Sequence, residues 1–314
     1  MSARRCMLFH RDFRAFTGGH GKVYDWYTHV ATHRNWQASI YFTPESRRDD
    51  DNPWIAAGIA SVVEWQPAQT HALFLAGNDW QAAVDASPVP PVINLIQGIR
   101  HADPSHVSNG YLSRPAVRVC VSAMVADALR ASGRVRGPIE VIEAGIDVVA
   151  LAALGDAAPA RQTVLVDAIK QPALGTAAAA HLAAHGVAHT LLQSPLPRAD
   201  YRRLLAQHAV CLLLPMTTEG FYLPALEAMA IGRAVVVPDA VGNRAYLESG
   251  RNALVPNPQP RDLATAAIDL MHDAAHRAVM AGAGRITAQR FTLERERAAA
   301  HALLDRIDAL WASL

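Results

Sequence analysis

Hydrophobic residues in this chain gather in short runs, each followed by a stretch of helical character. The clearest run, Val210–Leu214, has the length of a buried parallel strand, and a polar loop follows it. A helix is then predicted over Leu223–Ala230, because Pro224 suits a first helical turn and Gly232 can adopt the positive φ that ends a helix. A second apolar run, Ala234–Val237, follows at once. The pattern predicts a strand–helix–strand unit with parallel strands.

The same alternation covers the rest of the chain and indicates an α/β fold of doubly wound parallel sheets. Further strands are predicted over Cys6–His10, Ser39–Thr43, His71–Ala76, Pro91–Gln97, Val117–Ser122, Ile139–Glu143, Thr163–Val166, His189–Gln193 and Ala253–Val255. Helices are predicted from near Val23, over Ala123–Ala131 with Ser122 as its cap, over Pro172–His185 and Arg198–His208, from Arg261 onward, and over Thr292–Leu314. Residues 148–161, rich in Ala, Gly and Asp, read as a linker between two domains.

Two carboxylates lie in the strand–helix–strand unit, Glu219 on its loop and Glu227 inside its helix. In parallel sheets, ligands collect at the carboxyl ends of strands, against helix N-termini. Carboxylates there can accept hydrogen bonds from the hydroxyl pairs of a ribose or a hexose. The N–H groups of Gly220, Phe221 and Tyr222 can hold a phosphate or a sugar hydroxyl. Taken singly, each glutamate also fits a solvated position.

Together with its surroundings, this pair resembles a family motif. The two glutamates, seven residues apart in EGFYLPALEAMAIGRAVVVP, resemble the nucleotide-sugar site of retaining group 1 glycosyltransferases of the GT-B fold. The glycogen-synthase-like and lipopolysaccharide mannosyl- or glucosyltransferase types are the most similar in motif. The resemblance implies that Glu219 is a catalytic residue in contact with the transferred sugar and that Glu227 binds the ribose of the donor. The other donor-binding residues that it implies on this loop are Gly220, Phe221, Tyr222 and Leu223.

One position departs from the family pattern, which usually has a small glycine where this chain has Tyr222. A tyrosine beside the donor can change the choice of sugar, or the loop can bend differently.

The resemblance implies a GT-B architecture, in which two Rossmann-like domains face a cleft. We expect an acceptor-side domain over residues 1–148, a nucleotide-sugar-binding domain over 149–291, and a C-terminal helix over 292–314 that packs back on the first domain. The implied reaction transfers a hexose from a nucleotide-diphosphate sugar to a hydroxyl of a bacterial surface polysaccharide or lipopolysaccharide intermediate, with retention. In such front-face chemistry the departing phosphate takes the acceptor proton. Neither a protein nucleophile, nor a metal, nor a cofactor beyond the donor is then required.

A glycine-rich segment follows the first predicted strand and places Gly18, Gly19 and Gly21 before the expected helix. A loop of this kind lets the backbone approach a ligand closely. In the resembled fold it lies near the donor phosphates and the acceptor, which makes these glycines donor-binding candidates. A flexible turn is the alternative.

A polar loop after the predicted strand Pro91–Gln97 supplies three further candidates. Many enzymes of the resembled type have a histidine or a similar group here, near the reacting face of the sugar. His101 is therefore a catalytic candidate, and Gln97 and Arg100 are candidates for sugar or phosphate contacts. A surface histidine is an equally open interpretation of His101.

Lys170, in the first turn of the second domain, matches the lysine that neutralises the donor diphosphate in the resembled families. A diphosphate leaving group needs positive charge or N–H donors as its own charge develops. No arginine matches the second cation of the family pattern, and Asp167 lies nearby instead. Lys170 is therefore both a catalytic and a donor-binding candidate, and an ordinary surface lysine is the alternative.

No metal site is expected. The acidic run Asp49–Asp51 can resemble a metal-binding Asp-x-Asp pair, but its position before a turn favours a solvated loop. The pairs His181/His185 and His272/His276 have helical ligand spacing without the Glu or Cys companions of a zinc site.

Composition adds limits on compartment and partners. The 51% hydrophobic content and the net charge of +1 are typical of a soluble protein and do not indicate nucleic-acid binding. The three cysteines lie in or beside apolar runs, which favours buried thiols and a cytoplasmic protein. No apolar run is long enough to cross a bilayer, so any contact with the inner face of the cytoplasmic membrane is expected to be peripheral. The expected partners are a nucleotide-sugar donor and a glycan or lipid-linked acceptor, and the sequence does not indicate an oligomeric state.

Two other functions are compatible with these residues. A nucleotide-sugar epimerase of similar two-domain build would convert its substrate without an acceptor. A non-catalytic subunit that binds sugar nucleotides would bind without turnover, and the missing arginine and Tyr222 keep that interpretation open.

Overall fold

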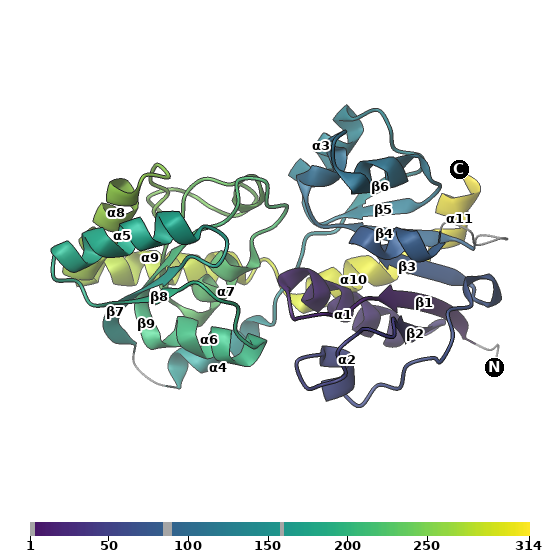
Figure 1. Cartoon of the computed structure of the whole chain (residues 1–314), viewed down its shortest axis with the longest axis horizontal. Helices are drawn as coiled ribbons and strands as arrows, with labels where there is room; N and C mark the ends of the chain where they lie inside the picture. The colour runs from purple at the N-terminus through teal and green to yellow at the C-terminus, as the bar shows by residue number, and fades with distance from the viewer. Residues whose placement is uncertain (1–3, 84–89, 158–159) are drawn as a thin grey trace. The chain divides into compact units, whose positions relative to one another are not determined.

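The computed structural model of the chain describes residues 4–83, 90–157 and 160–314. The chain divides into two compact units (Figure 1). The first unit comprises Met1–Ala144 and Glu294–Leu314, and the second comprises Gly145–Leu293. Each unit contains one parallel sheet with helices packed against it, which confirms the predicted α/β class.

The sheet of the first unit consists of parallel strands in the order β2-β1-β3-β4-β5-β6. Their bounds are β1 Arg5–Arg11, β2 Trp36–Phe42, β3 Ala72–Ala76, β4 Val92–Ile96, β5 Val117–Cys120 and β6 Ile139–Val141. Every residue of the central strands β3 and β4 is buried. Continuous apolar runs of this kind are expected where helices cover both faces of a parallel sheet.

The helices of the first unit come from both ends of the chain. They are α1 (Gly18–Ala31), α2 (Pro53–Ala56), α3 (Ala123–Ala131), α10 (Leu293–Leu304) and α11 (Ile307–Ala312), together with short 3-10 turns that include Ile99–Ala102 and Val107–Ser113. The predicted cap of α3 is confirmed, because the Ser122 hydroxyl accepts the Val125 N–H at 3.3 Å.

A buried ionic cluster fixes α10 against α1. The ammonium of Lys22 on α1 donates to Asp25 at 2.9 Å and also to Glu296 of α10. His29 Nε2 lies 3.6 Å from the same Glu296 carboxylate. The side chains of Lys22 and Glu296 are 3% and 1% exposed, so this polar contact lies in the interior of the first unit.

The second unit has the strand order β10-β9-β7-β8, and all the strands are parallel. The strands are β7 Arg161–Asp167, β8 His189–Leu192, β9 His208–Leu213 and β10 Ala234–Val236. The helices are α4 Val148–Asp156, α5 Pro172–Ala184, α6 Arg198–Gln207, α7 Leu223–Ile231, α8 Pro260–His272 and α9 Ala274–Ala288, and they lie on both faces of the sheet (Figure 1). Helix α7 ends as predicted at Gly232, which has φ 84°.

The predicted start of the first helix is wrong. Helix α1 begins at Gly18 rather than near Val23, so Gly18, Gly19 and Gly21 form its first turn instead of a loop. The cause is an N-cap, since the Thr17 hydroxyl accepts the His20 N–H at 3.2 Å and the Thr17 carbonyl accepts the Gly21 N–H at 3.0 Å.

The predicted linker is also wrong, because most of it forms helix α4. The Asp147 carboxylate caps this helix by accepting the Ala150 N–H at 2.9 Å, and alanines with high helix propensity follow. Residues 158 and 159 of the predicted linker lie outside the described residues.

Two smaller predictions differ from the structure. The single helix predicted over Thr292–Leu314 is broken between Leu304 and Ile307, although the side chains on either side of the break remain buried. The strand predicted over Ala253–Val255 is reduced to isolated bridges, one of which joins Leu254 to Val236 of β10.

Candidate functional site

Three of the predicted site residues lie together at the carboxyl ends of β7 and β9. Lys170 follows β7, and Glu219 lies on the loop between β9 and α7. The Lys170 ammonium donates to the Glu219 carboxylate and lies 5.1 Å from the centroid of the Tyr222 ring. Because β7 and β9 are neighbours in the sheet, their following loops meet at one edge. With side chains 40% and 18% exposed, Lys170 and Glu219 remain accessible to a ligand.

Tyr222 occupies an interior position on this loop. It is 2% exposed, and its carbonyl accepts the Tyr246 hydroxyl at 2.6 Å. Burial raises the pKa of Tyr222 well above its usual value, so the phenol stays neutral. The neighbouring Phe221 packs against Tyr246 and Phe291, with ring centroids 5.4 and 5.6 Å apart. Aromatic packing thus fixes the backbone of this loop where it leads into Leu223, the first residue of α7.

Gly242 lies against the same loop from the other side. A Cβ atom on Gly242 would lie 2.6 Å from the Phe221 nitrogen and 2.8 Å from the Gly220 carbonyl carbon. Both contacts are to backbone, which cannot rotate away as a flexible side chain would. The absence of a side chain at Gly242 is therefore a requirement of the loop conformation.

We expect Gly242→Ala to destabilise the protein by about 1–3 kcal/mol, the usual range for overpacking, and to displace residues 219–221. Chemical denaturation measures the first effect. Gly282→Ala is the matched control, because a Cβ at Gly282 on α9 meets nothing within 4 Å. This control should stabilise the helix slightly. Equal stability of the two variants would contradict the close contact at Gly242.

Glu227 is held by arginines that the sequence analysis did not select. It is 6% exposed, and its Oε1 accepts from Nε and Nη2 of Arg202 at 3.0 and 2.5 Å. Arg198 Nη2 lies 3.7 Å from the same oxygen. Both arginines belong to α6, and their i, i+4 spacing on a predicted helix was the available signal. The Glu227 carboxylate is thus oriented by α6.

Asp167 lies near the place where the resembled families have an arginine that this chain lacks. Its side chain is turned inward. Its carboxylate accepts the Tyr201 hydroxyl at 2.7 Å and the Ile169 N–H at 3.2 Å. Burial raises its pKa above the usual value, against the lowering effect of the bond from Tyr201. Beside it, the Gln171 amide donates to the Pro215 carbonyl and joins the loops that follow β7 and β9.

In the first unit, the predicted glycines and the polar loop after β4 are in contact. The Gln97 side-chain amide donates to the Gly19 carbonyl at 3.2 Å. Gly18 is exposed, whereas Gly21 is buried in the first turn of α1. Arg100 is exposed on the 3-10 turn Ile99–Ala102. The structure therefore brings Gly19 and Gln97 together at the carboxyl end of the sheet.

His101 is buried, and the surface histidine considered as an alternative is wrong. It is 4% exposed, and its carbonyl accepts the Asn109 side-chain amide at 3.0 Å. Burial, together with the charges of Arg100, His106 and Arg118, lowers the pKa of His101 from 6.5 to about 3. The imidazole is therefore neutral at physiological pH.

This depressed pKa predicts a loss of stability in acid. Between pH 6.5 and about 3 the unfolded chain binds a proton at His101 that the folded chain does not, so lowering the pH favours unfolding. The expected slope is about 1.4 kcal/mol per pH unit from this residue. Burial also lowers the pKa of His20, to about 4, so His20 adds to this slope.

Denaturation curves at several pH values test this expectation. His101→Gln should flatten the slope, whereas His272→Gln, at an exposed histidine of α8, should leave it unchanged. Parallel slopes for the parent protein and His101→Gln would refute the assignment.

Two further findings concern metals and membranes. Across the three described ranges, no group of three or more His, Cys, Asp or Glu side chains is placed to hold a metal ion. Arg47 pairs with Asp49 and Asp51 of the acidic run. Within the part of the chain that the structure describes, none of the helices has both the length and the hydrophobicity needed to cross a bilayer.

One known protein family is similar to part of this chain. Residues 167–273 match the profile of the family "Glycosyl transferases group 1". No curated protein sequence matches the chain significantly.

Solved structures match over nearly the whole chain. Anabaena HepE in complex with UDP-glucose superposes with a TM-score of 0.72 at 17% identity, covering 96% of this chain and 100% of HepE. Sucrose-phosphate synthase from Thermosynechococcus elongatus gives 0.67 at 14% identity, with 98% and 100% covered. A candidate UDP-N-acetylglucosamine 2-epimerase from Listeria monocytogenes gives 0.62 at 12% identity, with 97% and 96% covered. At these identities the likeness shows a shared fold.

The family match covers the loops that hold Lys170 and Glu219 and the helix α7 that holds Glu227. The two parallel-sheet units correspond to the fold of GT-B glycosyltransferases. The second unit therefore carries a group 1 glycosyl transferase domain, and the chain is an enzyme of the glycosyltransferase class.

Proposed function

We propose that this protein is a retaining hexosyltransferase that uses a nucleotide-diphosphate sugar. Its acceptor is a hydroxyl of a bacterial surface polysaccharide or lipopolysaccharide intermediate, which is a glycan or a lipid-linked glycan. The observation that carries the proposal is the contact between Lys170 and Glu219 at the entry to α7, inside the region of the family match. HepE, which shares the fold, binds UDP-glucose, and this supports a sugar nucleotide as donor.

Each residue of this cluster has a chemical role in the proposal. The Lys170 ammonium has three N–H donors, so it can keep its contact with Glu219 and still donate to a diphosphate oxygen. As the bond between the anomeric carbon and the phosphate oxygen breaks, Lys170 stabilises the negative charge that develops on the leaving group. Glu219 accepts hydrogen bonds from the hexose hydroxyls, and Glu227 accepts them from the ribose.

The acceptor attacks from the face that the diphosphate leaves. The acceptor oxygen forms the new glycosidic bond, and its proton moves to the departing phosphate oxygen, so that configuration is retained without a protein nucleophile. We also propose that residues of the first unit contact a sugar or a phosphate. These residues are Gly18, Gly19, Gly21, Gln97, Arg100 and His101. We further propose that the enzyme works without a metal, in the cytoplasm, at or near the inner face of the membrane.

The first experiment is a thermal-shift screen against nucleoside diphosphates and their sugar conjugates. A ligand that binds only the folded state raises the melting temperature. We expect one nucleotide to raise it selectively and Glu227→Ala to abolish that shift. The control is Glu248→Ala, at an exposed glutamate of the same unit. If no nucleotide shifts the melting temperature, or if Glu227→Ala behaves like the control, the proposed donor site is wrong.

A turnover assay with the selected donor then separates the proposal from an epimerase. The fold shared with the Listeria monocytogenes protein favours this second candidate. An epimerase converts the sugar nucleotide with no acceptor present, whereas the proposed transferase needs a hydroxyl acceptor. Running the assay with EDTA tests metal independence, for which we expect an unchanged rate.

A further inference from the structure

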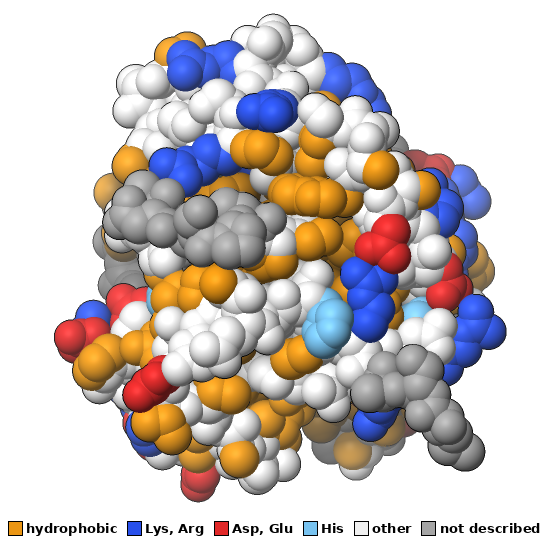
Figure 2. All heavy atoms as spheres, turned by 90° about the vertical axis from the view of Figure 1, so that its right-hand side faces the viewer, with side chains coloured by type: hydrophobic (Ala, Val, Ile, Leu, Met, Phe, Trp, Pro, Cys, Tyr) orange, Lys and Arg blue, Asp and Glu red, His pale blue; other side chains and the backbone are white. Residues whose placement is uncertain are grey.

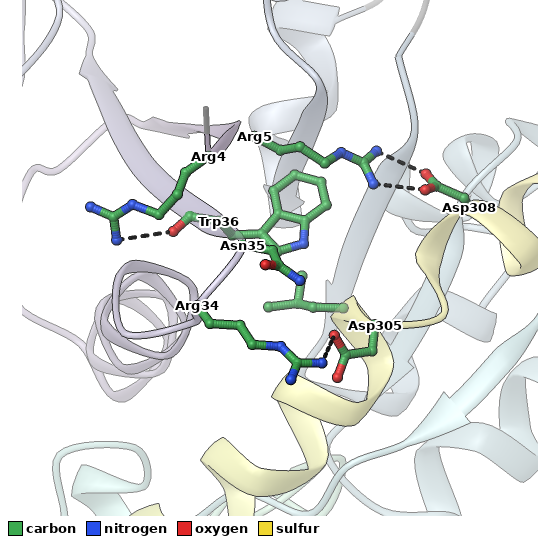
Figure 3. Close-up of a pocket in the computed structure, with 8 residues that line it drawn as sticks. Arg4, Arg5, Arg34, Asn35, Trp36, Asp305 and Asp308 are labelled. Carbon is green, nitrogen blue, oxygen red and sulfur yellow. Dashed lines mark hydrogen bonds and ion pairs between the residues drawn. The ribbon is translucent and has the colours of Figure 1, made fainter. Parts of the chain in front are cut away.

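Several arginine–carboxylate pairs of this protein lie at its surface. Figure 3 shows one of them in the first unit, where Arg5 donates to both oxygens of the exposed Asp308 at 2.7 and 2.8 Å. Figure 2 likewise shows basic side chains beside acidic ones on one face of the molecule. Water screens pairs of this kind, so each contributes little to stability. Such surface pairs need no functional explanation.

The pair formed by Arg202 and Glu227 in the second unit is different, because both side chains are largely buried. They are 17% and 7% exposed. A buried pair must offset the loss of water around both charges, and hydrophobic side chains of similar volume often stabilise a protein as well or better. Stability alone is therefore a weak explanation for this pair.

Arg202 fixes one oxygen of the Glu227 carboxylate and leaves the other for a ligand. Nε and Nη2 of Arg202 both donate to Oε1, at 3.0 and 2.5 Å. Among the residues that the structure describes, none donates a hydrogen bond to Oε2. A planar guanidinium that donates through two N–H groups defines the orientation of a carboxylate more narrowly than a single flexible donor does. Oε2 is therefore held in one orientation with its acceptor capacity intact.

Helix α6 is itself fixed at the residue before Arg202. The Tyr201 hydroxyl donates to Asp167 at 2.7 Å, and Asp167 is the buried last residue of β7. The Asp167 carboxylate also accepts the Ile169 N–H at 3.2 Å, in the turn that carries Lys170. Adjacent residues of α6 thus contact Asp167 and Glu227. Arg202 is consequently anchored at the predicted donor site.

Arg198 cannot take over the part of Arg202 in this arrangement. Its Nη2 lies 3.7 Å from Oε1 of Glu227, which is too far for a hydrogen bond. Arg198 adds positive charge beside the carboxylate without defining its orientation. The orientation of Glu227 therefore depends on Arg202.

We propose that Arg202 is a positioning residue for donor binding, which acts through Glu227 on the ribose hydroxyls of the nucleotide. The role rests on the proposed function, in which Glu227 accepts hydrogen bonds from the ribose. With Oε1 engaged by Arg202, Oε2 accepts from the 2′- and 3′-hydroxyls. A nucleotide without these hydroxyls gains nothing from Arg202. The arrangement therefore favours ribonucleoside diphosphates over analogues that lack the hydroxyl pair.

Isothermal titration calorimetry of the full-length protein tests this role with two series of ligands. The first series is ADP, CDP, GDP and UDP, and the second is their 2′,3′-dideoxy analogues, which keep the base and the diphosphate. Arg202→Ala is compared with Arg203→Ala, which removes the exposed neighbouring arginine that pairs with Asp200 on the same helix. Arg202→Lys keeps the charge without the planar fork, and it carries the same test if Arg202→Ala does not fold.

We expect the hydroxyl pair to strengthen binding to the parent protein about 10- to 100-fold, the effect of one hydrogen bond to a charged group. Arg202→Ala should lose most of this factor with the ribonucleotide and should bind the dideoxy analogue as the parent does. Arg202→Lys should lie between the two. Arg203→Ala should match the parent with both series.

The comparison of the two series separates positioning from a purely structural role. Equal weakening of both series by Arg202→Ala would overturn the inference, and so would unchanged binding of the ribonucleotide. If Glu227→Ala loses ribonucleotide binding and Arg202→Ala does not, the proposed donor site stands and the role of Arg202 is wrong. If the parent protein binds none of these nucleotides, the proposed donor site is itself wrong.

Discussion

Lys170→Ala is expected to lower kcat about 100- to 1,000-fold, the usual effect of removing one group that stabilises developing charge. Lys170 is the cation that the loops after β7 and β9 place against Glu219. Its removal also leaves that carboxylate without its partner, so recognition of the sugar should weaken as well. Steady-state kinetics with the selected donor measure both effects.

Two further variants show whether the loss at Lys170 is specific. Lys170→Arg keeps the charge with a different shape and should recover part of the rate. Arg244→Ala removes an exposed cation that pairs with Asp239 in the same unit and should leave kcat unchanged. An unchanged rate in Lys170→Ala would remove this residue from the catalytic assignment.

Glu296→Ala is expected to destabilise the folded protein by about 3–5 kcal/mol, the usual cost of breaking a buried ion pair. The variant removes the contact of the buried Lys22 ammonium with Glu296. Of the two carboxylate contacts described above, the one with Asp25 stays. Urea denaturation measures the change, and the first unit should account for it because α1 and α10 both belong to that unit.

The matched control for this variant is Glu294→Ala, two residues earlier on the same helix and exposed. It should cost less than about 1 kcal/mol, the range for a carboxylate near a helix N-terminus. Glu296→Gln, which keeps the size but not the charge, should fall between the two. If Glu296→Ala costs no more than the control, the buried cluster does not stabilise the first unit.

Most strands could be predicted because a buried parallel strand is a continuous apolar run with polar ends. The run Val210–Leu214 corresponds to β9, displaced by one or two residues, and Gly232 ends α7 through its positive φ. Helix α4 was missed because its alanines and glycine are also typical of linkers, and the decisive cap by Asp147 depends on the three-dimensional turn. The break after Leu304 leaves the apolar stripe intact, so periodicity alone could not detect it.

The candidate site was only partly accessible from sequence. The family motif selected Glu219, Glu227 and Lys170. Lys170 and Glu219 are far apart along the chain, so the sequence does not show that the Lys170 ammonium contacts Glu219. Arg202 was missed because its i, i+4 spacing from Arg198 predicts that both lie on one face of α6 but does not show that this face meets Glu227. The inward turn of Tyr222 likewise depends on Tyr246, which holds its carbonyl.

The burial of Lys22 has a practical consequence for chemical labelling. The chain contains only two lysines, and the side chain of Lys22 is 3% exposed whereas that of Lys170 is 40% exposed. An amine-reactive reagent should therefore acylate one lysine side chain of the folded protein, the one beside Glu219. The rate of that single modification, followed by mass spectrometry, becomes a direct measure of whether the region around Glu219 is occupied, without a chromogenic substrate or a known acceptor.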